Sequence, residues 1–516
     1  MKRSSGILMH ISSLPNSLGI GTLGNEAFDF VDFLCEAGQS YWQILPLGPT
    51  GKANSPYQSY SAFAGNPLLI GLDKLVNAGL LLVEELGVPP VTPDAGKVDF
   101  EHLSSWKNQL LRKAFVRFRI NFQHYKDDYY YFLGEHSWWL DDFALFCSIK
   151  AQYGDKCWNE WSRELVERNS HYLSMAFHKD ADEIEFYRFL QFLFFKQWFE
   201  LKNYANQKGI SIFGDMPLYV ALDSADVWSN QSIFSLDGRG KMVLSAGVPP
   251  DYFSDEGQLW GCPVFNWHQL EQRKYDWLLA RLHFNLHLFD LIRIDHFRGL
   301  ESFWAVPASE KNAIKGKWYP ASGYQVLEQL QSRLGHLPVV AEDLGLITPE
   351  VDQLRDHFGL PGMKVLQFAY ASDETDLNLP HNFKTNFVVY PGTHDNDTTV
   401  GWLKGLTGKE RSNLQVYYPG SNGVLNRRVV EAAWASVAFL SVASMQDILE
   451  LGSSARMNTP GTLQNNWIWR MDPKMLKRSQ IEFLKEITLK YNRRNANAAD
   501  GTSPGGRVVS DNDGIC

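Results

Sequence analysis

Eight short apolar runs, spread from residue 6 to residue 447, constrain the fold of this chain more than any other feature. They lie at residues 6–11, 41–47, 210–215, 289–295, 337–343, 363–369, 387–395 and 439–447. Their apolar character is continuous rather than alternating, which is typical of strands buried on both faces of a parallel sheet. Helical patterns separate many of them, including those over 25–38 and 429–439. The alternation predicts an α/β protein with a closed (β/α)8 TIM barrel, which needs eight such strands.

Two long gaps between the runs predict large inserted subdomains. Residues from about 50 to 208 are too many for one crossover and contain a strongly helical stretch over 184–209, so this insertion should be mostly helical. A second insertion, at about 217–285, contains a loop rich in Gly, Pro and aromatic residues. We expect a single catalytic barrel over 1–490, followed by a disordered polar tail over 491–516.

Charge and composition exclude several classes of partner. The net charge of -9 gives no basic surface for nucleic acid or anionic lipid, and no apolar stretch is long enough for a membrane span. The N-terminus lacks the pattern of a signal peptide, and the five cysteines are scattered, which favours a cytoplasmic protein with reduced thiols. The many aromatic rings could stack on sugars or simply fill a core.

Acidic residues close four of the eight runs: Asp215, Asp295, Glu342 and Asp395. The carboxyl ends of barrel strands form the active-site face, so these carboxylates should meet at one mouth. Each acid alone could instead cap the helix that follows its strand. Capping does not explain the accompanying basic residues, which are Arg293, His296 and His394. The set therefore favours retaining glycosidic chemistry, which uses paired carboxylates.

The neighbours of two of these acids predict different protonation states. Arg293 precedes Asp295 by two residues and shares its strand face, so it should keep Asp295 ionised. Glu342 follows a wholly apolar segment, which should raise its pKa and suit it to act as an acid/base. Asp343 should point to the other side of the strand.

Several motifs resemble those of the 4-α-glucanotransferases, also called amylomaltases or disproportionating enzymes, in the α-amylase superfamily (glycoside hydrolase family 77). The catalytic segments are LIRIDHFRG at 291–299, VVAEDLG at 339–345 and GTHDND at 392–397. The resemblance extends over residues 5–490. Further matching segments lie at 10–24, 55–70, 213–228, 247–261 and 457–470.

This resemblance implies a retaining double displacement that transfers part of an α-1,4-glucan to the 4-hydroxyl of an acceptor. Asp295 would be the nucleophile, Glu342 the acid/base and Asp395 the stabiliser of the transition state. The implied substrate-binding residues are Tyr57, Asp215, Tyr252, Phe253, Gln258, Trp260, Arg293, His296 and His394. The rings of Tyr57, Tyr252, Phe253 and Trp260 could instead pack their own loops.

The expected substrates are maltooligosaccharides and amylose-like α-1,4-glucans, with glucose also serving as acceptor. The acceptor must outcompete water, and we expect the loop over 247–261 to exclude it. No cofactor is expected, because no phosphate-binding glycine motif follows a strand. No metal is expected, and the sequence does not determine the oligomeric state.

Three other functions remain open from the sequence. An α-glucan hydrolase would use the same carboxylates and pass the intermediate to water. A metal-dependent barrel hydrolase could use His10, His296 and His394, although no HxH or HExxH motif is present. A non-catalytic glucan-binding protein would keep the aromatic residues.

Overall fold

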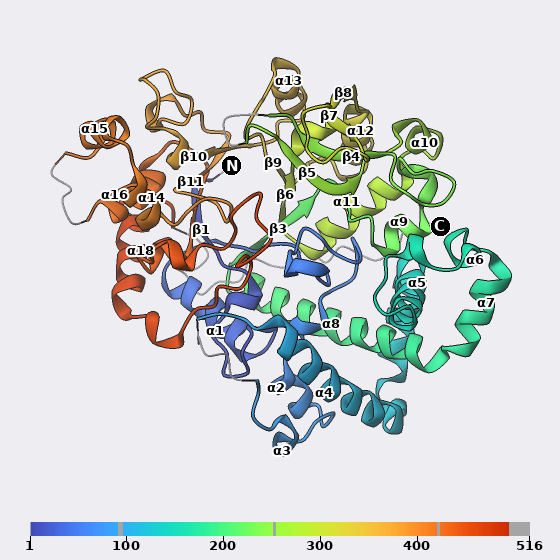
Figure 1. The fold of residues 1–516 in the computed structure, drawn as a ribbon. Coiled ribbons are helices and arrows are strands. Elements are labelled where there is room, and N and C mark those ends of the chain that lie inside the picture. Colours follow the sequence, from blue (N-terminus) through green and yellow to red (C-terminus); the bar gives the residue numbers. More distant parts are fainter. Residues whose placement is uncertain (1, 91–95, 251–253, 420–423, 495–516) are drawn as a thin grey trace.

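A nearly closed barrel of parallel strands forms the centre of the molecule (Figure 1). The structure is a computed structural model that describes residues 2–90, 96–250, 254–419 and 424–494. The strand order is β10-β11-β12-β1-β2-β3-β6-β9. The edge strands β9 and β10 approach each other where the N–H of Ala341 donates to the carbonyl of Pro361 at 2.8 Å. The predicted (β/α)8 fold is confirmed.

Each of the eight predicted runs overlaps one barrel strand. The strands are β1 (Ser4–Leu8), β2 (Tyr41–Gln43), β3 (Ser211–Pro217), β6 (Leu291–Asp295), β9 (Val339–Ala341), β10 (Gly362–Val365), β11 (Phe387–Tyr390) and β12 (Leu440–Ser444). All residues of β9, β11 and β12 are buried, as expected for strands covered on both faces. Most strands are shorter than their apolar runs, and β11 ends before Pro391, which cannot donate to a sheet ladder.

Helices surround the barrel and follow the predicted helical patterns. Those between the barrel strands, or after the last one, include α1 (Asn25–Glu36), α8 (Ala181–Gln207), α11 (Asp276–Leu288), α12 (Gly323–Leu334), α13 (Pro349–His357), α16 (Leu425–Ala435) and α18 (Arg478–Lys490). The remaining α-helices after β3 are α9 (Ala225–Ser229), α10 (Trp267–Gln272), α14 (Thr399–Gly405), α15 (Gly408–Tyr417) and α17 (Met445–Ile448).

The segment between β2 and β3 is mostly helical and packs around aromatic side chains. Its helices before α8 are α2 (Leu72–Asn77), α3 (Val83–Leu86), α4 (Phe100–Ile120), α5 (Phe122–Gln152), α6 (Arg163–Val166) and α7 (Ser170–Lys179). Phe118 of α4 lies 4.7 Å from Phe189 of α8, centroid to centroid, and α5 packs along α8. Much of the aromatic content therefore fills this core. The boundaries at about 50–208 and about 217–285 stay predictions.

A second sheet, which the sequence did not reveal, is antiparallel and has the order β5-β4-β7-β8. Its strands are β4 (Leu244–Val248), β5 (Gln258–Pro263), β7 (Ser302–Pro307) and β8 (Lys317–Pro320). These segments are short, contain Gly or Pro, and are only partly buried, so they lack the continuous apolar signal of the barrel strands. The short helix η6 (Phe297–Leu300) joins β6 to β7, which places this sheet beside the carboxyl end of β6.

The chain remains packed against the barrel as far as Arg493. The Arg493 side chain is fully buried, and its guanidinium donates to the carbonyls of Ser436 and Ala438 at 2.9 Å each. The tail predicted over 491–516 stays a prediction, since residues 495–516 lie outside the described residues. None of the described helices combines the length and hydropathy of a membrane span.

Two glycines, one in a barrel strand and one in an outer helix, test how tightly each element is packed. A Cβ at Gly214 in β3 would lie 2.2 Å from the Phe289 ring, whereas one at Gly134 in α5 would meet no atom within 4 Å. We expect Gly214→Ala to lower the free energy of unfolding by about 1–3 kcal/mol. Gly134→Ala should raise it by up to about 1 kcal/mol, because alanine favours the helix. Urea denaturation of both variants checks this, and equal shifts of the same sign would contradict it.

Candidate active site

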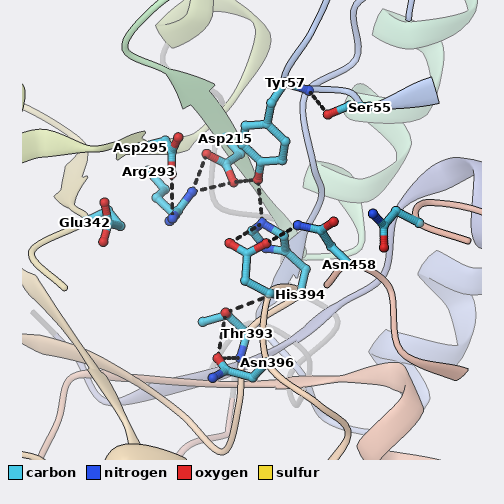
Figure 2. A network of polar contacts seen from close by, with 12 residues as sticks. Ser55, Tyr57, Asp215, Arg293, Asp295, Glu342, Thr393, His394, Asn396 and Asn458 are labelled. Atoms are coloured by element: carbon cyan, nitrogen blue, oxygen red, sulfur yellow. Dashed lines mark hydrogen bonds and ion pairs between the residues drawn. The ribbon is translucent and has the colours of Figure 1, made fainter. Parts of the chain in front are cut away.

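The buried guanidinium of Arg293 joins two of the predicted acids. Asp215 in β3 and Arg293 in β6 are register partners, and Arg293 Nη1 lies 2.9 and 2.8 Å from the two carboxylate oxygens of Asp215. Its Nη2 lies 2.8 Å from Asp295 Oδ1. Figure 2 shows Arg293 between the two carboxylates. The predicted pairing of Arg293 with Asp295 is thus present.

The two acids bound to Arg293 differ in their access to solvent. The Asp295 side chain is 30% exposed, whereas that of Asp215 has no exposed surface. Burial raises the pKa of Asp215, and the charge of Arg293 opposes this shift. Asp215 contacts Arg293 and Tyr57, and its predicted role in substrate binding stays a prediction. These contacts fix the positions of the Arg293 guanidinium and the Tyr57 hydroxyl.

Tyr57 links the Asp215 pair to the segment after β11. Its hydroxyl donates to Asp215 Oδ2 at 2.7 Å and lies 2.8 Å from His394 Nε2. Since the single hydroxyl proton goes to Asp215, His394 Nε2 must be the donor in the second contact. The Tyr57 and His394 rings also stack, with centroids 5.4 Å apart. Both residues were predicted to be in the site.

Asp395 lies next to His394, and its side chain is partly exposed. Its Oδ2 is 3.3 Å from His394 Nε2, and its Oδ1 accepts from Asn458 Nδ2 at 2.6 Å. Burial raises the pKa of Asp395, but the charge and hydrogen bond of His394 and the hydrogen bond from Asn458 outweigh it, so the pKa lies below its usual value. Burial lowers the pKa of His394, and Asp395 reverses this to leave it raised. The geometry therefore favours an ionic pair.

Glu342 lies on the other side of Arg293 and Asp295 from His394 (Figure 2). It follows β9 directly, and its carboxylate accepts from the N–H groups of His296 at 2.8 Å and Leu344 at 3.0 Å. Burial, reinforced by the charge of Asp295, raises the pKa of Glu342 to about 7 despite the opposing charge of Arg293. The raised pKa expected from the sequence is confirmed.

Asp343 points away from this site, as expected. It accepts from Arg355 Nη1 at 2.5 Å and from the N–H of Met363 at 2.7 Å.

His296, Gln258 and Trp260 form a contiguous group beside Glu342. The rings of Trp260 and His296 meet edge to face at 4.7 Å, and Trp260 Nε1 donates to Gln258 Oε1 at 3.3 Å. Burial lowers the pKa of His296 to about 4, so its ring is neutral near pH 7. Its φ of 54° is left-handed, which turns the backbone N–H toward Glu342. The predicted contacts Tyr252 and Phe253 lie outside the described residues.

Two residues of the site were not singled out from the sequence. Asn458 holds Asp395, and Trp467 packs on Tyr57 and His394 with ring centroids 5.6 and 5.9 Å away. Trp467 has a left-handed φ of 65°, a strained conformation that is common at functional sites. Both belong to the matching segment 457–470, but no spacing rule connects that segment to the carboxylates.

His10 lines a small pocket that also includes His394. Burial, with a smaller contribution from His394, lowers the pKa of His10 to about 3. Among the residues that the structure describes, no group of three or more His, Cys, Asp or Glu side chains is arranged to hold a metal ion.

Known proteins share both the sequence and the fold. Residues 9–476 match the family described as 4-alpha-glucanotransferase. A 4-alpha-glucanotransferase from Synechocystis sp. is 48% identical over 500 residues, covering 96% of this chain and 98% of its own length. One from Thermus thermophilus is 46% identical over 483 residues, covering 92% and 95%. The structure of amylomaltase from Streptococcus agalactiae in complex with acarbose superposes with a TM-score of 0.94 at 40% identity, covering 96% of this chain and all of that one. The chain belongs to the 4-alpha-glucanotransferase family.

Proposed function

We propose that Asp295, Glu342 and Asp395 carry out the transfer reaction of this enzyme by double displacement. The protein is a 4-alpha-glucanotransferase, which moves a segment of an α-1,4-glucan to the 4-hydroxyl of an acceptor. In the first step Asp295 attacks the anomeric carbon, and Glu342 gives its proton to the departing glycosidic oxygen. In the second step the acceptor 4-hydroxyl gives a proton to Glu342 and displaces Asp295. The observation that carries these roles is the different environment of the two carboxyl groups.

The environment of Glu342 suits it to exchange a proton near neutral pH. A pKa of about 7 leaves both protonation states populated there, as an acid/base needs. Asp295 instead has the Arg293 guanidinium at 2.8 Å, which holds one carboxylate oxygen and leaves the other available for attack. The fixed charge of Arg293 also requires no rearrangement during the reaction.

The Tyr57, His394 and Asp395 group supports the developing positive charge on the sugar. Asp395 has a lowered pKa and 40% of its side chain exposed, so its carboxylate can face the sugar ring. Positive charge develops at the anomeric carbon in the oxocarbenium-like transition state, and a prepositioned carboxylate stabilises it. We assign His394 and Arg293 to hydroxyl contacts beside it.

The preferred substrates follow from the wall that Gln258, Trp260 and His296 form near Glu342. A flat indole beside the acid/base can support an acceptor sugar, and a bound acceptor displaces water from the intermediate. We propose maltooligosaccharides and amylose-like glucans as donors, with glucose and longer chains as acceptors. The loop over 247–261 would exclude water when the acceptor is bound.

Removing the carboxylate of Asp295 tests the proposed nucleophile. With maltotriose alone, the unmodified enzyme should produce glucose together with maltopentaose and longer products, as read by chromatography. Asp295→Asn should reduce this by more than about 10³-fold, because the covalent intermediate cannot form.

Asp290 provides the control, because it lies just before the amino end of β6, whereas Asp295 lies at the carboxyl end. Asp290→Asn makes the same chemical change away from the site. It should keep nearly full activity. Glucose and maltose as the only products of the unmodified enzyme would instead indicate a hydrolase.

The pH dependence tests the proposed acid. Glu342 must be protonated for the first step and is protonated below its pKa, so kcat/KM for maltotriose should fall about tenfold per pH unit above about pH 7. Release of fluoride from α-maltotriosyl fluoride needs little acid assistance, so its loss above pH 7 should be much smaller. Identical alkaline profiles for the two substrates would exclude Glu342 as the acid of the first step.

A further inference from the structure

Trp318 on β8 is an exposed aromatic ring with a fixed orientation. It is 37% exposed, and the Arg298 guanidinium lies 3.9 Å from the centroid of its ring. Its register partner across the sheet, Trp304, contacts it with centroids 5.3 Å apart. The guanidinium and the second indole together hold the ring, so its exposed surface is presented to solvent without the entropy cost of fixing a mobile side chain.

The ring is connected to the Glu342 side of the active site. Arg298 follows the proposed nucleophile Asp295 by three residues, and its Nη1 donates to the carbonyl of Leu346, in the segment that follows Glu342. Glu342 and His394 lie on opposite sides of Arg293 in Figure 2, so Trp318 is attached to the acid/base side. No equivalent link runs from Trp318 to the His394 side among the contacts of the described residues.

The same hairpin also holds the loop expected to contact substrate. Trp304 Nε1 donates to the carbonyl of Ala313, and the N–H of Ala313 donates to the carbonyl of Glu256, each at 2.9 Å. A Cβ at Gly257 would lie only 2.8 Å from that of Ala313, so the two segments are in close contact. Trp318 therefore belongs to one packed unit with the 247–261 loop, in which Trp260 also lies.

We propose that the exposed indole of Trp318 is a stacking platform for the glucan chain on the acceptor side, beyond the sugar that carries the reacting hydroxyl. The proposal rests on the assignment of Glu342 as acid/base. The departing and the incoming sugar both exchange a proton with that residue, so the chain attached to either leaves the site on its side. An α-glucan has apolar ring faces that pack on aromatic side chains. The β7–β8 hairpin is part of the same sheet as β5, which contains Trp260, so a chain that extends beyond Trp260 along this sheet would reach it.

Tyr319 provides a matched control on the same strand. It is 38% exposed, almost the same as Trp318, but neighbouring strand residues point to opposite faces of the sheet. Its ring stacks on the buried Phe303 at 5.8 Å, on the side of the main core. Loss of Tyr319 should therefore affect packing and leave the acceptor platform unchanged.

The experiment uses α-maltotriosyl fluoride as donor, because fluoride occupies no acceptor sugar position. Transfer to glucose and to maltotetraose is measured for the unmodified enzyme, Trp318→Ala, Trp318→Phe and Tyr319→Ala. Trp318→Ala should raise KM for maltotetraose roughly three- to tenfold, with KM for glucose and kcat unchanged. Trp318→Phe should have a smaller effect, and Tyr319→Ala should have none on either KM.

Three outcomes would overturn the platform. These are an unchanged KM for maltotetraose in Trp318→Ala, an equal rise for glucose and maltotetraose, or the same rise in Tyr319→Ala. Thermal unfolding identifies a variant that fails to fold. If Trp318→Ala fails to fold, the test uses the more conservative Trp318→Phe, and the ratio of its KM for maltotetraose to its KM for glucose is compared with that of the unmodified enzyme. Failure of the proposed function is a separate result, since the unmodified enzyme would then release fluoride without forming longer glucans.

Discussion

The active site depends on one buried cation, the guanidinium of Arg293. It lies where β3 and β6 run side by side and pairs with the buried Asp215 and the partly exposed Asp295. Removing one partner from a buried ion pair leaves an uncompensated charge at a cost of about 3–5 kcal/mol, so the three side chains are stable only together. Asp215 in turn accepts from Tyr57, which contacts His394. The positions of four further groups thus follow from one charge inside the barrel.

The two sides of this cation have different electrostatics. On one side His394 and Asn458 lower the pKa of Asp395, which favours its carboxylate form. On the other, burial and the nearby charge of Asp295 raise the pKa of Glu342 to about 7. Retaining chemistry needs this separation, because one carboxyl group must supply a proton while another carries negative charge. The barrel provides it by placing acids from different strands in unequal surroundings.

The second sheet distinguishes this protein from a bare barrel. Its strands β4 and β5 precede β6 in the chain and β7 and β8 follow it, and the sheet brings together the 247–261 loop, the β7–β8 hairpin and the segment after Glu342. We propose that a wall of this kind holds an acceptor beside the covalent intermediate, which would favour transfer over hydrolysis. The helical segment between β2 and β3 contributes differently, because its aromatic rings mainly pack against one another.

The sequence alone determined the barrel, because strands buried on both faces need continuous apolar runs, and it placed Asp295, Glu342 and Asp395 at their ends. It also predicted the Arg293–Asp295 pair, which depends only on the two-residue period of one strand. Only the tertiary structure decided the burial of Asp215, the contact between Tyr57 and His394, and the places of Asn458 and Trp467. These contacts join residues up to several hundred positions apart, and no local pattern encodes them. The second sheet was missed for a related reason. Its strands pair with one another across long stretches of sequence and have no continuous apolar pattern of their own.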